Sequence, residues 1–437
     1  MGHLGHLKSE YRALAQRLEA GTIALPEPST PEAWQAWKEI LEILFSPEDA
    51  ALASRLPIVP TGLRSLAKRL GVKEAELQPR LEALCERGLV LDLVSPKTGR
   101  AKYLLAPPVV GFFEFSMMRA HDSVPKRRMA EALEAYTRFD EAFAQEVCGH
   151  PTPVGRTLVH ENVLGEELPD VLDFERATSL IEGADRLAVS LCFCRHMAQH
   201  LGHACDAPME NCLSLNGGAD FVVRRKFGRA LERSEALEIL HRSRQDGLVQ
   251  IADNVQSRPS YLCNCCGCCC HQLRSITEHD LRGVVPSGFV ARPVESDACA
   301  GCSRCARACP IAAVSMNPRR HTAKRKSDLS PSVDRDRCIG CGLCAEACRK
   351  GAMRMERRAE PPAVPADLLE RALRMSLERG RLAHLVFDQA ESRSSAFMNR
   401  LLAGLTRLPP VKQALANEQL RSRFVRFMLK RVKDPSA

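Results

Sequence analysis

Two runs of four cysteines with the same spacing are the clearest chemical signal in the sequence. Both runs follow C-x2-C-x2-C-x3-C, 39 residues apart, and residues 297–316 and 336–355 are identical at ten of twenty aligned positions. They are therefore an internal repeat. The eight cysteines are Cys299, Cys302, Cys305 and Cys309, then Cys338, Cys341, Cys344 and Cys348. Three thiolates two residues apart can bind three irons of a cubane, and the fourth iron then needs a ligand from a distance.

Over about residues 290–357 the chain resembles a bacterial-type two-cluster 2[4Fe-4S] ferredoxin module, on the strength of these two runs. In that family the fourth cysteine of each run ligates the other cluster, so the resemblance implies two [4Fe-4S] clusters. Cluster I would be bound by Cys299, Cys302, Cys305 and Cys348. Cluster II would be bound by Cys338, Cys341, Cys344 and Cys309. Gly301 and Gly340 suit loops whose backbone passes close to sulfur.

The module departs from the family pattern in two places. Arg349 stands where a proline usually follows the fourth cysteine, and 28 residues separate Cys309 from Cys338. The insert carries a basic run, which is either a solvated loop or a docking patch for an acidic redox partner. The run comprises Arg319, Arg320, His321, Lys324, Arg325 and Lys326. Zinc is the alternative metal for the eight cysteines, but zinc sites usually pair C-x2-C knuckles across a longer loop, so the doubled triplets favour iron-sulfur clusters.

Ten more cysteines lie upstream, and they are too many to be incidental. They are Cys192, Cys194, Cys205, Cys212, Cys263, Cys265, Cys266, Cys268, Cys269 and Cys270. Alternate side chains of an extended chain share a face, so Cys192 with Cys194, and Cys263 with Cys265, are expected to form pairs, whereas Cys265 and Cys266 point apart. The first four cysteines predict one four-thiolate site, and those from Cys263 to Cys270 predict a second.

The whole chain resembles a group of larger ferredoxin-type proteins from anaerobic bacteria, through its C-x-C-R and C-N-C-C-x-C-C-C segments. The resemblance implies redox work with one or two further clusters in the middle of the chain. Zinc ligation and thiol or disulfide redox chemistry are the alternatives there. Four histidines lie among these cysteines, and we expect them to be polar surface residues and not metal ligands: His196, His200, His203 and His271. Arg195 either donates a hydrogen bond to sulfur or forms a surface ion pair.

The elements before the cysteines predict a winged-helix-like start. Helices are expected at 31–44, capped by Thr30, and at 61–71 and 73–87, followed by a hairpin that turns near residues 97–99. The helix at 73–87, which would enter a DNA groove, is slightly acidic, so protein docking is favoured over nucleic-acid binding.

The expected fold class is α+β and multidomain. The predicted domains are a winged-helix-like unit (1–122), a cysteine-rich α+β unit (123–285), the ferredoxin-like 2[4Fe-4S] module (290–357) and a helical basic tail (358–437). In the cysteine-rich unit we expect helices near 127–147 and 174–183, a strand at 186–194, and further strands at GLVQIAD and PSYLCNC.

Composition limits the function classes. The 437 residues are 45% hydrophobic and 26% charged, with no apolar run long enough to cross a bilayer and no start typical of a signal peptide. All but two of the 20 cysteines, Cys85 and Cys148, lie between residues 192 and 348. Because the chain is expected to be cytoplasmic, where disulfides are rare, this density favours metal ligation over disulfide bonds. Most of the formal charge of +9 lies in the C-terminal tail. The tail is expected to be a packed helix with a basic face, and peripheral contact with an anionic membrane is the alternative.

These observations predict a protein that transfers single electrons between redox partners, without a catalytic residue of its own. A redox-responsive DNA-binding regulator and an electron-input subunit of a larger oxidoreductase are the alternatives. Its partners are expected to be redox proteins with acidic docking surfaces.

Overall fold

The computed structural model describes residues 7–164, 171–294, 298–318 and 329–387. The chain forms two compact units, which we call unit 1 and unit 2. Unit 1 comprises Met1–Ser116, Asp122–Thr152 and Pro365–Ala437, and unit 2 comprises Met117–His121 and Pro153–Val364. Residues 123–152, which we predicted within the cysteine-rich domain, thus pack with the N-terminal helices. The mixture of helices and sheets agrees with the expected α+β class.

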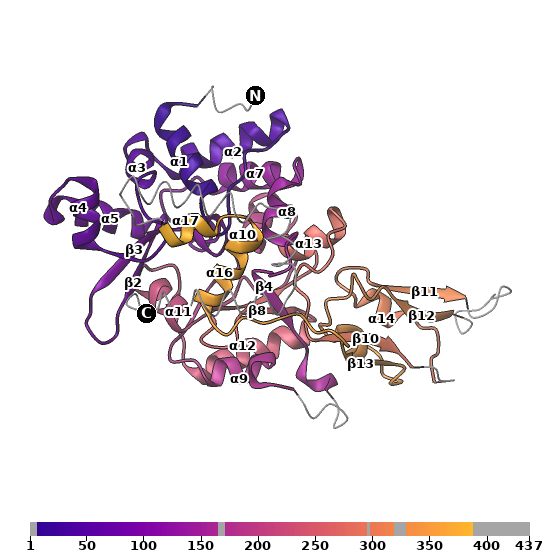
Figure 1. Cartoon of the computed structure of the whole chain (residues 1–437). Coiled ribbons are helices and arrows are strands. Elements are labelled where there is room, and N and C mark those ends of the chain that lie inside the picture. Colours follow the sequence, from indigo (N-terminus) through magenta and orange to yellow (C-terminus); the bar gives the residue numbers. More distant parts are fainter. Residues whose placement is uncertain (1–6, 165–170, 295–297, 319–328, 388–437) are drawn as a thin grey trace, which may run out of the picture. The chain divides into compact units, whose positions relative to one another are not determined.

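Unit 1 is mainly helical (Figure 1). Its helices are α1 (Ser9–Glu19), α2 (Pro31–Leu44), α3 (Pro47–Ala53), α4 (Leu63–Leu70), α5 (Glu74–Glu86), α6 (Phe113–Met117), α7 (Lys126–Arg138), α8 (Ala142–Cys148), α16 (Leu368–Glu378) and α17 (Leu382–Phe387). The predicted cap of α2 is confirmed, because the Thr30 side chain accepts a hydrogen bond from the amide of Ala33. Buried aromatic side chains, among them Trp37, Phe45 and Tyr136, form the core.

Unit 1 also contains a small antiparallel sheet in the order β1-β3-β2, whose first strand precedes α4 and whose other two follow α5. Its strands are β1 (Thr61–Gly62), β2 (Val90–Val94) and β3 (Ala101–Leu105). The predicted hairpin is confirmed, with Val90 opposite Leu105 and Val94 opposite Ala101.

One predicted helix of unit 1 is broken in the structure. The stretch expected as a single helix over 127–147 forms α7, with Phe139 as its C-cap, and α8, with Glu141 as its N-cap, and Asp140 lies between these caps. Its carboxylate accepts hydrogen bonds from the amide of Ala142 at 2.7 Å and from the amide and hydroxyl of Ser29. These hydrogen bonds hold the backbone at Asp140 in a turn and not in a continuous helix.

Unit 2 is built on a six-stranded antiparallel sheet in the order β4-β8-β9-β6-β5-β7. Its strands are β4 (Gly155–Leu158), β5 (Leu187–Leu191), β6 (Glu210–Leu215), β7 (Arg229–Ala230), β8 (Val249–Asp253) and β9 (Tyr261–Cys265). The strands predicted at GLVQIAD and PSYLCNC are confirmed as β8 and β9. Helices α9 (Ala177–Glu182) and α12 (Arg233–Gln245) supply apolar side chains that pack with Leu213, Leu215 and Leu262 of the sheet in one buried core.

The remaining helices of unit 2 are α10 (Phe193–His200), α11 (Asn216–Arg224), α13 (His271–Glu278), α14 (Arg304–Arg307) and α15 (Leu343–Glu346), with short 3-10 turns at Glu161–Val163 and Asp173–Glu175. The strand expected over 186–194 is shorter than predicted. The β5–β6 register shifts between Ser190 and Leu191, and Cys192 is already the N-cap of α10. The cysteines at 192 and 194 therefore lie at a helix start and not on one face of a strand.

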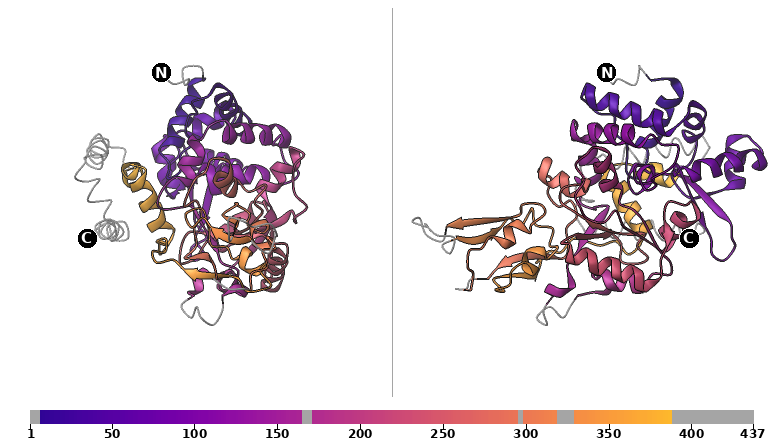
Figure 2. Two further views of the ribbon diagram at one scale, coloured as in Figure 1. Left: turned by 90° about the vertical axis from the view of Figure 1, so that its right-hand side faces the viewer. Right: turned by 180° about the vertical axis from the view of Figure 1, so that it is seen from behind.

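Two further strand pairs form the repeat module, residues 290–357. β10 (Phe289–Pro293) pairs with β13 (Met353–Arg357), and β11 (Val314–Pro318) pairs with β12 (Leu329–Val333), both antiparallel. Figure 2 shows these pairs beside the six-stranded sheet rather than stacked on it. Among the described residues, no helix has the length and apolar character that crossing a membrane requires.

Candidate metal centre

The two cysteine runs are built alike in three dimensions. In each, a loop with the first two cysteines leads into a short helix, α14 or α15, that begins just before the third cysteine. Equivalent residues adopt the same left-handed backbone conformation, with φ +61° at Gly301 and +72° at Gly340, and +61° at Ser303 and +90° at Gly342. The sequence repeat is therefore also a conformational repeat.

Gly340 shows why the loop of the second run needs glycine. A Cβ atom there would lie 2.1 Å from the carbonyl oxygen of Phe289 and 2.1 Å from the hydroxyl oxygen of Ser287. No side chain can be placed at such distances, so the backbone of the loop can lie this close to β10 only because residue 340 has none.

The second run surrounds a small cavity together with the last cysteine of the first run. Cys338, Cys341, Cys344 and Cys309 line it, with apolar side chains that include Ile311, Ile339 and Met355. The first three cysteines of the second run are buried. Burial raises the pKa of Cys341, and the neighbouring charges of Cys344, Cys309 and Cys338 raise it further. Burial, and then the charges of Cys338, Cys309 and Cys305, raise the pKa of Cys344 to about 12. Thiolates gathered in this way need a bound cation to be stable.

The first run lies at a more accessible place. Cys302 is exposed, Cys299 and Cys348 are half-buried, and Cys305 is buried. Burial raises the pKa of Cys305, and the charges of Cys348 and Cys299 also act on it. The structure thus brings Cys348 of the second run toward the first, as it brings Cys309 of the first run toward the second. Four thiols at each place, with an apolar cavity at one of them, fit the donor set that a cubane cluster takes.

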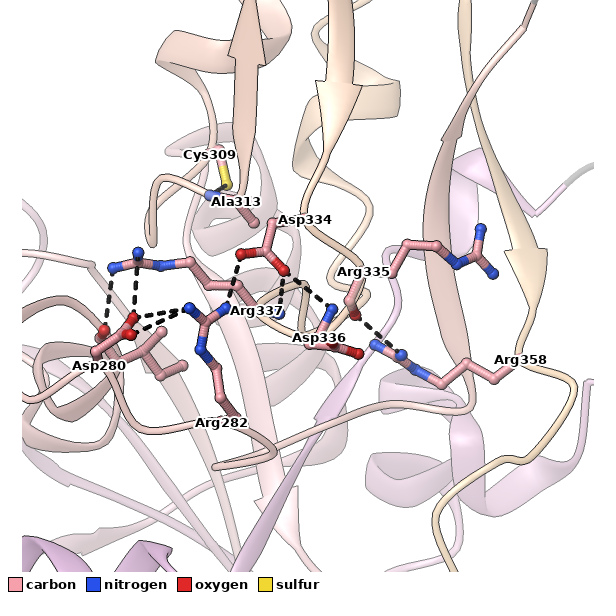
Figure 3. Close-up of polar contacts among 10 residues, drawn as sticks. Asp280, Arg282, Cys309, Ala313, Asp334, Arg335, Asp336, Arg337 and Arg358 are labelled. Atoms are coloured by element: carbon pink, nitrogen blue, oxygen red, sulfur yellow. Dashed lines mark hydrogen bonds and ion pairs between the residues drawn. The ribbon is translucent and has the colours of Figure 1, made fainter.

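Hydrogen bonds fix the turn that leads into the second run (Figure 3). One carboxylate oxygen of Asp334 accepts hydrogen bonds from the amides of Asp336 and Arg337, both at 3.1 Å, and the other accepts from Arg282 at 2.7 Å. The hydrogen bond from Arg282 lowers the pKa of Asp334, and the amide of Arg337 lowers it further. In the same view the amide of Ala313 donates to the sulfur of Cys309 at 3.1 Å. Such contacts orient the residues that would ligate a metal.

His160 is a residue at this site that the sequence did not indicate. Its amide donates to the carbonyl oxygen of Cys341 at 2.9 Å, and its Nδ1 lies 2.7 Å from a carboxylate oxygen of Glu346. Its Nε2 lies 3.0 Å from the carbonyl oxygen of Leu248, and the ring is fully buried. His160 therefore joins the loop after β4 to the second run. Because 186 residues separate it from Glu346, no local pattern could have pointed to the contact.

The ten upstream cysteines gather in two groups on unit 2. The four-thiol group consists of Cys205, Cys266, Cys268 and Cys269, whose sulfur atoms all lie within 4.8 Å of one another. The six-thiol group, whose members interact with one another, consists of Cys192, Cys194, Cys212, Cys263, Cys265 and Cys270. Cys265 and Cys266 are neighbours in the chain and fall into different groups. Cys205 lies with the cysteines from 266 to 269, which corrects the expectation that it shares a site with Cys192, Cys194 and Cys212. The long loop between α10 and β6 carries it there, away from the strand and helix ends that position the other three.

Cross-strand register assembles the centre of the six-thiol group. Cys212 on β6 lies directly opposite Cys263 on β9, with their sulfur atoms 3.7 Å apart. Hydrogen bonds from Cys212 and then Cys265 lower the pKa of Cys263 to about 5. Hydrogen bonds from Cys194 and Cys265 likewise lower the pKa of Cys270. Burial raises the pKa of Cys192, and hydrogen bonds to Cys270 and Cys263 raise those of Cys194 and Cys265, so Cys263 and Cys270 are the members that lose a proton first.

Arg195 lies beside the four-thiol group and is fully buried. Its guanidinium donates to the sulfur of Cys266 at 3.6 Å and to the carbonyl oxygen of Pro208. Of the two roles left open by the sequence, the structure assigns the hydrogen bond to sulfur. His196 is engaged elsewhere, with Nδ1 2.6 Å from the carbonyl oxygen of Met117 and Nε2 3.2 Å from Nε2 of His200. His271 stacks on Phe193 with ring centroids 5.7 Å apart.

Comparison with known proteins gives one match, and it covers the region of the two cysteine runs. A family model described as a 4Fe-4S dicluster domain matches residues 298–352. No curated protein and no solved structure matches the chain. The matched segment, which contains all eight cysteines of the two runs, shows that the chain is an iron-sulfur protein with a region similar to 4Fe-4S dicluster domains.

Proposed function

We propose that this protein transfers single electrons between redox partners through two [4Fe-4S] clusters. Cys299, Cys302, Cys305 and Cys348 would hold the first, and Cys338, Cys341, Cys344 and Cys309 the second. The observation that carries the proposal is the crossed arrangement, in which Cys309 lines one cavity with the three buried cysteines of the other run. When bound, such clusters supply one-electron redox chemistry.

The chain's own residues would protect and orient the second set of ligands. Ile311, Ile339 and Met355 exclude water from the cavity, and the amide of Ala313 donates to the sulfur of Cys309. Both effects influence the reduction potential, because burial and hydrogen bonds to sulfur are the main ways in which a protein adjusts it.

We propose that redox partners dock at the first set of ligands, because it is the more accessible one. Cys302 is exposed, and so are the surrounding basic side chains Arg304, Arg307, Arg349 and Lys350. This basic surface suits an acidic partner. The basic run predicted as a docking patch, residues 319–326, and the tail from residue 388 lie outside the described residues.

A further iron-sulfur cluster at the six-thiol group is part of the proposal. It is supported by six thiols from four elements and by the lowered pKa of Cys263 and of Cys270. Their spread over two strands and two helix starts offers more donors than a single mononuclear ion needs.

The regulator remains a second proposal, supported by one observation. The hairpin β2–β3 carries exposed Lys97, Arg100 and Lys102, as a DNA-contacting wing would. Exposed Glu74 and Glu76 in the first turn of α5 oppose phosphate binding. An anaerobic electrophoretic shift assay in both oxidation states tests it, and binding that never exceeds the non-specific level contradicts it. An electron-input subunit would instead co-purify with a stable partner from native cells.

Paired cysteine variants test the electron-transfer proposal. Anaerobically purified protein should contain about eight irons and eight acid-labile sulfides in the repeat module. Replacing Cys341 and Cys344 together by Ala should remove about four of each, and so should replacing Cys302 and Cys305. Cys85→Ala, in the core of unit 1, should leave both counts unchanged. Iron content unaffected by either pair would refute the assignment.

A further inference from the structure

The four-thiol group, Cys205, Cys266, Cys268 and Cys269, takes no part in the proposed electron transfer. Three of its members come from the turn between β9 and α13, and Cys205 comes from the loop after α10. All four sulfur atoms lie within 4.8 Å of one another. Two of the separations are 3.5 Å, between Cys205 and Cys266, and 3.8 Å, between Cys268 and Cys269.

The size of this group distinguishes between two kinds of centre. Sulfur atoms about 2.3 Å from one tetrahedral zinc ion stand about 3.8 Å from each other. A cubane instead carries its four thiolates on four different irons at separate corners, so the thiolates stand farther apart. The observed separations match the edges of a tetrahedron around a single ion.

We propose that the four-thiol group binds one zinc ion through Cys205, Cys266, Cys268 and Cys269. Four protein thiolates leave no coordination position for water or substrate, so the centre is structural and closed. It would tie the loop after α10 to the turn that precedes α13. This site is distinct from the eight cysteines of the repeat module and from the six-thiol group.

The charge around the group suits this assignment. A zinc ion with four thiolates carries a net charge of two negative units, which is costly to bury without a counter-charge. Arg195 provides a positive charge, fully buried, with its guanidinium 3.6 Å from the sulfur of Cys266. The residue thus acts as a positioning residue that contacts a ligand and not the metal.

The turn that carries three of the ligands lies against the repeat module. A Cβ atom on Gly267 would lie 2.4 Å from the carbonyl oxygen of Pro310, the residue after Cys309. The backbone of the turn therefore packs directly on the segment that follows a predicted cluster ligand. A zinc ion that fixed this turn would also fix the surface on which Pro310 rests.

Metal analysis of the full chain tests the proposal. Protein produced with both iron and zinc in the medium and purified without oxygen should contain about one zinc ion per chain, besides its iron. X-ray absorption at the zinc edge should show four sulfur neighbours at about 2.3 Å. The zinc count and the iron count are separate readouts, so this proposal and the electron-transfer proposal can fail independently.

Variants locate the zinc ion. Cys268→Ala should lose it while the iron of the repeat module is retained, and because Cys268 is the exposed member, little packing is lost. Cys85→Ala is the control, because it also removes one thiol but outside the four-thiol group, and this variant should keep the zinc. Arg195→Met should weaken zinc binding about 10- to 100-fold in competition with a chromophoric chelator, and Arg195→Lys should restore part of it.

Three results would overturn the proposal. One is iron in place of zinc at these thiols, seen as iron lost with Cys268→Ala. Another is a disulfide between two of the four cysteines in the oxygen-free protein. The third is zinc that stays fully bound in Cys268→Ala while the circular dichroism of the variant remains native.

Discussion

Single glycine residues determine the backbone conformation at and after the cysteine loops. Gly340 and Gly351 both have a left-handed backbone, at φ +72° and +63°, but their surroundings differ. A Cβ at Gly340 would collide with Phe289 and Ser287, whereas a Cβ at Gly351 would meet nothing within 4 Å. The two positions therefore separate the cost of the conformation from the cost of the collision.

We expect Gly340→Ala to destabilise the repeat module much more than Gly351→Ala. The conformation alone costs about 1–2 kcal/mol at either position, and the collision adds to it only at Gly340. The measurement is the temperature at which the visible absorbance of the oxygen-free protein is lost. Equal shifts for the two variants would show that the close approach at Gly340 does not matter.

At the scale of elements, the sequence predicted those helices and strands that depend on residues close together in the chain. The helices α2, α4 and α5, the β2–β3 hairpin and the strands β8 and β9 follow from caps, periodicity and turn residues close by in the chain. The break at Asp140 was missed because its partner, Ser29, lies 111 residues away. Cys205 was grouped wrongly for the same reason, since sequence spacing cannot say which loop returns to which turn.

A long-range ion pair of unit 1 illustrates how such distant contacts stabilise the fold. Glu146 on α8 accepts hydrogen bonds from Arg381, from Arg379 at 3.2 Å and from the amide of Ala24 at 3.0 Å. Its side chain is 9% exposed, and that of Arg379 is 1% exposed. Burial alone would raise the pKa of Glu146, but the hydrogen bonds from Arg381 and Ala24 lower it overall.

We expect Glu146→Gln to destabilise unit 1 by about 3 kcal/mol at pH 7, because it leaves buried guanidinium groups without their counter-charge. Since the folded-state pKa is lowered, this stabilisation is present above the usual glutamate pKa of 4.5 and is lost as pH falls through the lowered value. The difference between the variant and the parent should therefore shrink in acid. Both tryptophans, Trp34 and Trp37, lie on α2, so fluorescence during urea unfolding reports on unit 1.

Glu131→Gln is the matched control, because Glu131 pairs with Arg127 on the exposed surface of α7. Its loss should change the stability by less than about 1 kcal/mol at either pH. A Glu146→Gln variant as stable as this control would contradict the role assigned to the buried pair.

At the scale of the whole molecule, the two sets of module cysteines differ in accessibility, and the proposed docking surface rests on this difference. The first set has the exposed Cys302 among exposed arginines. In the second set three of the four cysteines are buried, and His160 joins this set to the loop after β4. The eight candidate ligands could be named from spacing and family resemblance. Their unequal burial could not, because it depends on how the module packs against the rest of unit 2.

We expect the double variant Arg304→Glu and Arg349→Glu to slow reduction by a small acidic flavoprotein about tenfold at low ionic strength, because it reverses the charge of the docking surface. Stopped-flow absorbance measures the rate, and the difference should fade as salt is added. Arg233→Glu, on the exposed start of α12, should have little effect. An equal slowing by both changes would place the docking surface elsewhere.

Electron paramagnetic resonance of the fully reduced, oxygen-free protein is the decisive test of two adjacent clusters in the repeat module. We predict a signal that integrates to about two spins from the module and is broadened by their interaction, with about eight irons and eight sulfides to account for it. Loss of Cys341 and Cys344 should leave a single narrow spin there. Colourless protein, or zinc at these eight cysteines with no such signal, would contradict the proposed electron transfer.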